Sequence, residues 1–230
     1  MDRIEAVTFD LDDTLIQYRR SPGEVLRASF ERLGVDPMFA VEEYYARYDE
    51  FAETCDSMDQ LRSDCFAALA AGSGFDRESG REVAATFSDE RDQSNVELLP
   101  GVERVLTAAS RQFPVAVVKN GAADAQREKC DAVELERWVE TIIIAGHETP
   151  PKPAPDAFER ALQSLDVAPG RAIHVGDSLD TDVAGASAAG LHSVWVGHGN
   201  PENVEPTYQV ETVEDVLSLP WLRDGSTGSR

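Results

Sequence analysis

The second half of the chain alternates short apolar runs with helical segments, and this alternation constrains the fold more than any other feature. A first β-branched run ends at Phe9, and further apolar runs follow at 114–121, 141–146, 171–177 and 192–197. Helical patterns separate these later runs from one another. Apolar strands joined through helices are typical of a parallel sheet that is covered on both faces. We therefore predict an α/β fold built on a parallel sheet.

A stretch from residue 21 to about residue 88 is helical in character and interrupts this pattern after the first strand. Pro22 after Ser21 marks a helix start, and Gly34 is a stop signal. An insertion of about 70 residues is too long for a loop in a compact domain. We therefore expect a core domain from residues 1–16 and 97–222, a helical domain from residues 17–96, and a flexible tail at residues 223–230.

Charged residues gather at the ends of the predicted strands. Asp10 and Asp12 follow the first strand, and Asp177 ends the strand at 171–177. Ligands bind at the carboxyl ends of parallel strands, so these carboxylates should share one site. Three oxygen ligands without His or Cys indicate a hard cation, and Mg²⁺ fits best. Lys152 adds a point charge suited to a phosphate group.

Four segments at these strand ends resemble the four ordered motifs of the haloacid dehalogenase-like hydrolase superfamily: FDLDDTL, VVKNG, KPAPDAF and VGDSLDTD. The helical insertion resembles the C1 cap class of phosphoglycolate phosphatase-type members. The resemblance covers the whole chain apart from the tail. It implies a Rossmann-like core with a helical cap. It also implies a Mg²⁺-dependent phosphatase that hydrolyses a small phosphorylated metabolite through an aspartyl-phosphate.

The same resemblance implies roles for individual residues. Asp10 would be the nucleophile, and Asp12 would be the general acid and then the base. Lys152 would neutralise charge around Asp10 and the phosphoryl group. The implied metal ligands are Asp10, the backbone carbonyl of Asp12, and Asp177, with Asp182 as an outer or alternate ligand.

The second motif departs from the family pattern at one position. Thr14 would hold the catalytic loop and contribute to substrate binding. Asn120 and Gly121 would also bind substrate, with the Gly121 N–H able to donate to phosphate. The residue before Asn-Gly is normally Thr or Ser, but here it is Lys119. A lysine can contact the same phosphoryl oxygen with a full charge. We interpret Lys119 as a working substitution, because two of the three lysines in the chain fall at expected site positions. A damaged site, or a lysine that points elsewhere, is the alternative.

Other activities on the same fold stay open at this point. Asp12 disfavours a 2-haloacid dehalogenase, because dehalogenation needs no general acid two residues after the nucleophile. A sugar-phosphate mutase would keep the same four motifs. The substitution at Lys119 also leaves room for a catalytically weak binding or regulatory protein.

The charge balance narrows the range of partners. The chain has 43 acidic and 21 basic residues, a net charge of -22, which disfavours nucleic acids and anionic membrane surfaces. Dispersed acidity with few lysines is typical of halophilic proteins. No apolar run approaches the about 20 residues of a membrane span, and we see no signal peptide pattern. The three cysteines have no metal-site spacing. We expect a cytoplasmic protein, and the sequence does not indicate an oligomeric state.

Overall fold

The computed structural model describes residues 3–52, 55, 57–146, 149–201 and 204–223. The chain divides into two compact units: Met1–Gln17 together with Val96–Arg230, and Tyr18–Asn95. Most of the expected tail, residues 224–230, lies outside the described residues. We describe each unit separately.

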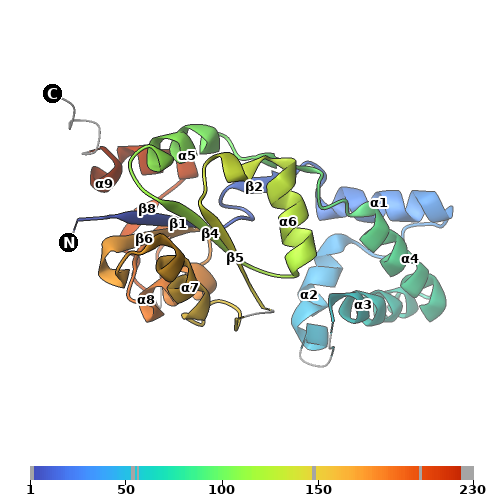
Figure 1. Cartoon of the computed structure of the whole chain (residues 1–230). Coiled ribbons are helices and arrows are strands. Elements are labelled where there is room, and N and C mark those ends of the chain that lie inside the picture. Colours follow the sequence, from blue (N-terminus) through green and yellow to red (C-terminus); the bar gives the residue numbers. More distant parts are fainter. Residues whose placement is uncertain (1–2, 53–54, 56, 147–148, 202–203, 224–230) are drawn as a thin grey trace. The chain divides into compact units, whose positions relative to one another are not determined.

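A six-stranded sheet forms the centre of the first unit (Figure 1), in the order β5-β4-β1-β6-β7-β8. Every pair of neighbouring strands whose register is defined is parallel, which confirms the predicted parallel sheet. The strands are β1 (Ala6–Phe9), β4 (Val115–Asn120), β5 (Thr141–Ala145), β6 (Ala172–Gly176), β7 (His192–Val196) and β8 (Tyr208–Val210).

Helices flank this sheet, as the alternating pattern predicted. They are α5 (Val102–Ser110), α6 (Ala123–Ala132), α7 (Asp156–Leu165), α8 (Ala184–Ala188) and α9 (Pro220–Arg223). Small apolar side chains of β1, β4 and β5 pack with Phe158 and Leu162 of α7 and with Ala186 of α8 in one buried cluster. In Figure 1, α5 lies across the sheet from α7 and α8. Both faces of the sheet are therefore covered.

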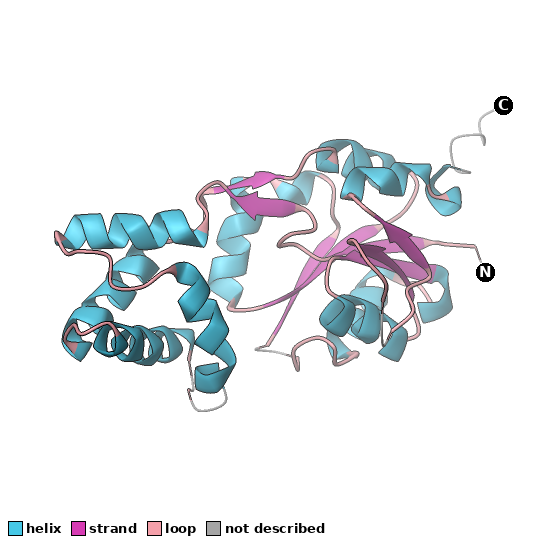
Figure 2. Cartoon of the chain, turned by 180° about the vertical axis from the view of Figure 1, so that it is seen from behind, coloured by secondary structure: helices cyan, strands magenta, loops and turns pink. Residues whose placement is uncertain are grey.

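One detail differs from the sequence expectations. The short strands β2 (Ile16–Tyr18) and β3 (Val96–Leu98) pair as a separate two-stranded sheet, seen in Figure 2. With three residues each, they are too short to show an alternating pattern. Residues 213–218 form a short 3₁₀ helix.

The described residues of the second unit form the helices α1 (Pro22–Leu33), α2 (Val41–Ala52), α3 (Met58–Gly72) and α4 (Arg77–Glu90). The α1 start is a capping box in which Ser21 and Glu24 satisfy each other's backbone N–H groups, and α1 ends at Gly34 with φ 67°. The core centres on Phe66, which packs edge-on against Phe39, Tyr44 and Phe87. None of the helices in the described residues of the chain combines the length and apolar character that a membrane span requires.

Candidate active site

The candidate site lies at the carboxyl ends of three adjacent strands, β4, β1 and β6. Asp10 follows β1, Lys119 and Asn120 end β4, and Asp177 follows β6. The chain runs from β1 outward to β5 and then returns to place β6 on the other side of β1. Such a reversal of strand order opens a crevice at the carboxyl edge of the sheet. The topology thus gathers residues that are far apart in sequence.

Asp10 is buried between two ammonium groups. Its Oδ1 lies 2.6 Å from Nζ of Lys152, and its Oδ2 lies 3.5 Å from Nζ of Lys119. Burial raises the pKa of the Asp10 carboxyl and the Asp182 carboxylate adds to this effect, while the two lysines oppose it. The net effect is a raised pKa, so the two lysines offset only part of the burial and only partly restore the ionised form that a nucleophile needs.

Lys152 is itself held on several sides. Besides Asp10, its Nζ donates to Oδ1 of Asp182 at 2.6 Å and to the carbonyl of Val118 at 2.8 Å. The side chain of Asn120 bonds both backbone groups of Lys152. The buried ammonium group of Lys152 thus donates to three acceptors, Asp10, Asp182 and the Val118 carbonyl. These contacts hold it against Asp10 and compensate for its burial.

Asp182 organises the inner edge of the site. Its Oδ1 accepts from Lys152 and lies 3.3 Å from Nε2 of the fully buried His174, and its Oδ2 accepts the Ser178 N–H at 3.0 Å. Burial raises its pKa, but His174 and Lys152 outweigh burial and hold the pKa well below the usual range. A Cβ on Gly176 would lie 2.4 Å from Cγ of Asp182, so only glycine leaves room for this carboxylate.

Three carboxylates could hold a metal ion. Oxygen atoms of Asp10, Asp177 and Asp182 lie within 4.8 Å of one another. Burial, and then the Asp10 and Asp182 carboxylates, raise the pKa of Asp177 to about 6, and Thr14 opposes this by donating to Asp177 Oδ1 at 3.1 Å. An all-oxygen donor set with mutually repelling charges suits a hard divalent cation. Both oxygens of Asp182 accept protein hydrogen bonds, whereas Asp177 accepts one from Thr14 at Oδ1, so Asp177 is the better direct ligand of the two.

Asp12 is flanked by two lysines. Nζ of Lys119 lies 3.2 Å from Asp12 Oδ2, and Nζ of Lys129 lies 2.8 Å from Oδ1 and 2.9 Å from Oδ2. Burial raises the pKa of Asp12, but the two ammonium groups outweigh it and lower the pKa. Burial lowers the pKa of Lys119, but the carboxylates of Asp10 and Asp12 outweigh burial and raise it. The Lys119 side chain therefore carries a positive charge.

Sequence reasoning missed Lys129. It lies on α6, outside the four motifs, and nothing in its local pattern distinguishes it from a surface lysine. The available signal was the scarcity of lysine: of three lysines in the chain, Lys119 and Lys152 stand in the motifs, which makes the third a candidate for the same site. In the structure all three ammonium groups contact Asp10 or Asp12.

Three residues expected to bind substrate have other partners in this structure. The Asn120 side chain holds the Lys152 backbone, as described above. The Gly121 N–H, which we expected to donate to phosphate, donates to the Ala145 carbonyl at 3.0 Å because it continues the β4–β5 ladder. Thr14 uses its hydroxyl to bond Asp177. The three residues thus shape the site through neighbouring groups.

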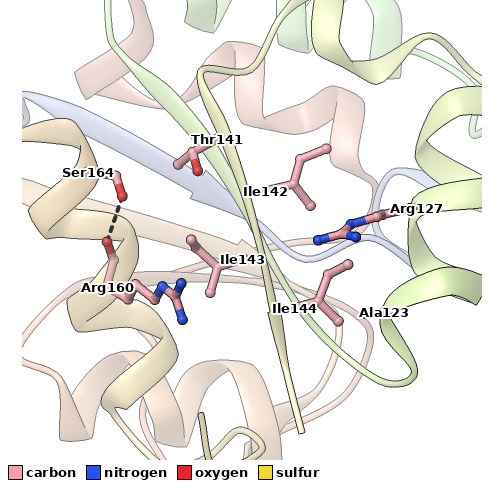
Figure 3. Close-up of a pocket in the computed structure, with 8 residues that line it drawn as sticks. All are labelled: Ala123, Arg127, Thr141, Ile142, Ile143, Ile144, Arg160 and Ser164. Carbon is pink, nitrogen blue, oxygen red and sulfur yellow. Dashed lines mark hydrogen bonds between the residues drawn. The ribbon is translucent and has the colours of Figure 1, made fainter. Parts of the chain in front are cut away.

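A cavity of about 270 Å³ lies at the edge strand β5, separate from these residues (Figure 3). Ile142 and Ile144 point to the side of Arg127, while Thr141 and Ile143 point to the side of Arg160 and Ser164. None of the predicted site residues is among the described residues that line this cavity. The candidate site residues therefore lie away from this cavity.

Comparison with known proteins gives a consistent result. Residues 4–190 match the family model of the haloacid dehalogenase-like hydrolases. N-acylneuraminate-9-phosphatase of Mus musculus is 28% identical over an alignment 247 residues long. The alignment covers 96% of this chain and 94% of that enzyme. Phosphoserine phosphatase of Thermus thermophilus is 30% identical, covering 93% of this chain and 98% of that enzyme.

Solved structures show the same fold. The HAD-hydrolase YfnB of Bacillus subtilis, in a crystal structure bound to magnesium, superposes with a TM-score of 0.76 at 21% identity, covering 94% of this chain and 98% of that one. A 2-haloacid dehalogenase from Pseudomonas syringae superposes with a TM-score of 0.62 at 24% identity, covering 94% and 97%. At these identities the similarity concerns the fold alone.

Proposed function

Because this chain belongs to the haloacid dehalogenase-like hydrolase family, we propose that it hydrolyses the phosphate monoester of a small metabolite. The observation that carries the proposal is the placement of Asp12. Its carboxylate lies beside that of Asp10, with the ammonium group of Lys119 in contact with both. A second carboxyl group next to a carboxylate nucleophile can protonate an ester oxygen as it leaves. Displacement of a halide needs no such proton.

The first half of the reaction forms a covalent intermediate. A carboxylate oxygen of Asp10 attacks phosphorus, and the bond from phosphorus to the ester oxygen breaks. The electron pair of that bond stays on the ester oxygen, which takes a proton from Asp12 and leaves as the alcohol. Lys152 holds Asp10 in place through its 2.6 Å contact, and Lys119 offers a positive charge to the phosphoryl oxygens.

The second half releases phosphate. Asp12, now ionised, accepts a proton from a water molecule as that water attacks phosphorus. The bond between phosphorus and Asp10 breaks, its electrons return to the Asp10 carboxylate, and inorganic phosphate leaves. The two lysines at Asp12 lower its pKa, which favours the ionised form used in this step, whereas the first step needs Asp12 to carry a proton against that preference. Asp12 is thereby reprotonated for the next cycle.

We assign Mg²⁺ as the cofactor, held by Asp10, Asp177 and the backbone carbonyl of Asp12. Asp182 acts by holding Lys152, whose Nζ lies 2.6 Å from Asp182 Oδ1. When bound, the cation would neutralise charge on the phosphoryl group and the carboxylates. The carboxylate donor set and the repulsion that raises the pKa of Asp177 support this choice.

Names of relatives indicate the substrate class. N-acylneuraminate-9-phosphatase, phosphoserine phosphatase and the glyceraldehyde 3-phosphate phosphatase of Pyrococcus furiosus are each named for a small phosphate ester. We place this chain among enzymes of that class. The helical unit Tyr18–Asn95 would act as the cap that selects the substrate and excludes water.

The working environment we infer is a cytosol of high salt. With a net charge of -22, the acidic side chains repel one another strongly in dilute buffer. Molar salt shortens the Debye length to about 3 Å and screens this repulsion. Among the residues that the structure describes, Lys119, Lys129 and Lys152 offset the acidic charge at the site. Assays should therefore be run in molar KCl.

The test is a screen of phosphorylated metabolites with and without Mg²⁺, for the wild type, Asp10→Asn and the control Asp131→Asn, an exposed aspartate on α6. We expect Mg²⁺-dependent phosphate release by the wild type and the control but not by Asp10→Asn. Full activity of Asp10→Asn would show that the nucleophile is another group. A folded wild type that releases no phosphate from any ester would contradict the proposal.

Two additional assays separate the rival functions. Formation of lactate from 2-chloropropionate, which can be measured in molar KCl, would identify a dehalogenase. Transfer of the phosphoryl group to a second sugar position, without free phosphate, would identify a mutase. If neither reaction nor phosphate release occurs, while phosphate esters still bind, the chain is a binding protein.

A further inference from the structure

The ammonium group of Lys129, a residue outside the four motifs, contacts both carboxylate oxygens of Asp12. Its Nζ lies 2.8 Å from Oδ1 and 2.9 Å from Oδ2 of the carboxylate. The side chain of Lys129 is 5% exposed, against 16% for Lys119, so Lys129 is enclosed by protein. A buried ammonium group is stable only with close acceptors, and Asp12 supplies two of them.

The helix that carries Lys129 is itself fixed beside the site. Gln126, one turn earlier on α6, is also buried, and a Cβ on Gly121 would lie 2.6 Å from Nε2 of Gln126. Gln126 thus packs directly on the loop that follows Lys119 and Asn120. Since α6 is held against this loop, the stem of Lys129 starts from a fixed point. Its ammonium group can therefore hold the Asp12 carboxylate in one orientation.

The two oxygens of Asp12 have different surroundings. Oδ1 contacts Lys129, whereas Oδ2 contacts both Lys129 and Lys119, and Lys119 also contacts Asp10. Oδ2 is therefore the oxygen on the side of Asp10. A proton on Oδ2 would weaken its contact with the ammonium groups but leave Oδ1 on Lys129. The carboxyl group would then stay anchored by one oxygen while the other is presented to the reacting ester.

We propose that Lys129 is a positioning residue that anchors Asp12 through Oδ1, so that Oδ2 faces the leaving oxygen of the substrate. This inference rests on the proposed function, in which Asp12 is the general acid and base. The proton moves from Asp12 Oδ2 to the ester oxygen as the bond to phosphorus breaks and its electron pair stays on that oxygen. Lys129 keeps its protons throughout and does not touch the substrate.

Phenyl phosphate and p-nitrophenyl phosphate are matched probes for this role. They have the same charge and nearly the same shape, but phenolate is much the more basic leaving group and depends more on protonation. We expect Lys129→Met to lower kcat for phenyl phosphate by about tenfold or more, with a much smaller effect on p-nitrophenyl phosphate and no change in KM. Arg127→Met, which removes an exposed charge from the same helix, should leave both rates unchanged.

Asp12→Asn separates the two proposals. It should show the same selective loss for phenyl phosphate, and Asp12→Asn/Lys129→Met should lose no more than Asp12→Asn alone, because the two residues act as one unit. If Asp12→Asn slows both esters equally, Asp12 is not the acid and the proposed function fails. If Asp12→Asn is selective but Lys129→Met slows both esters equally, or raises KM alone, the positioning role is overturned.

A second substitution guards against a folding defect. Lys129→Arg keeps the charge and can still contact both carboxylate oxygens. It should retain more of the phenyl phosphate rate than Lys129→Met at a similar thermal unfolding midpoint. A Lys129→Arg variant that folds like the wild type, but whose kcat falls as far as that of Lys129→Met with each ester, would contradict the anchoring role.

Discussion

Asn120 holds the backbone of Lys152 with both ends of its side-chain amide. Its Nδ2 donates to the Lys152 carbonyl at 3.0 Å, and its Oδ1 accepts the Lys152 N–H at 2.7 Å. Lys152 in turn places its ammonium group 2.6 Å from Oδ1 of Asp10. The second motif thus reaches the candidate nucleophile through the third. Asn120 acts in this geometry as a clamp on Lys152.

We predict that Asn120→Ala lowers kcat by about tenfold or more, with little change in KM, because Lys152 loses both backbone contacts that aim it at Asp10. The free energy of unfolding should fall by about 1–3 kcal/mol, since buried backbone groups lose their partners. Steady-state kinetics and urea unfolding measure the two effects. Asn200→Ala, at an exposed loop position, is the matched control. An Asn120→Ala enzyme with wild-type kcat would refute the clamp.

Lys119→Thr restores the residue that the family motif normally carries. Its ammonium group contacts both Asp10 and Asp12, so removing it takes away a charge that an incoming phosphate would meet. We expect inorganic phosphate to bind about tenfold more weakly, as measured by competitive inhibition. Lys119→Arg should retain most of the affinity. If the threonine variant keeps both turnover and phosphate affinity, Lys119 does not contact phosphate.

Binding of Mg²⁺ should weaken as the pH falls through about 6. A cation and a proton compete for the Asp177 carboxylate, whose pKa is raised to about 6 by burial and by Asp10 and Asp182. The Thr14 hydroxyl lowers this pKa by donating to Asp177. In Thr14→Val the pKa rises further, so Mg²⁺ affinity should fall at a higher pH than in the wild type.

Isothermal titration with Mg²⁺ on both sides of pH 6 measures this shift. Thr86→Val, at a buried threonine in α4, is the control and should follow the wild-type profile. A Thr14→Val profile that coincides with the wild type would mean that the hydroxyl does not act on the metal site. Metal affinity that is constant across this range would exclude Asp177 as a ligand.

Gly80 is needed for the close approach of α3 and α4. A Cβ at this position would lie 2.5 Å from the carbonyl oxygen of Phe66 and 2.7 Å from Cα of Ala67, which are backbone atoms of α3. Gly80→Ala should therefore destabilise the helical unit by about 1–3 kcal/mol in thermal or urea unfolding. Gly72→Ala has open space around it and should be neutral or stabilising by up to about 1 kcal/mol. Equal behaviour of the two variants would contradict the packing argument.

Local patterns were enough to predict the sheet, its flanking helices and the segments that carry the site. Apolar runs and helical periodicity report on contacts between neighbours in sequence, and a parallel sheet brings the carboxyl ends of its strands to one edge. Asp10 and Asp177 could be placed at that edge for this reason. The strands β2 and β3 escaped prediction because three residues carry no readable period.

The partners of each side chain depended on the tertiary structure. Lys129 meets Asp12 across 117 residues, Thr14 meets Asp177 across 163, and only packing of α6 and of β6 beside β1 brings them together. The sequence by itself indicated the motif charges, such as Asp10, Lys152 and Asp177, and the edge of the sheet at which they gather, but not Lys129. Tertiary packing decided which ammonium group faces which carboxylate, because those distances depend on how separate elements lie against the sheet.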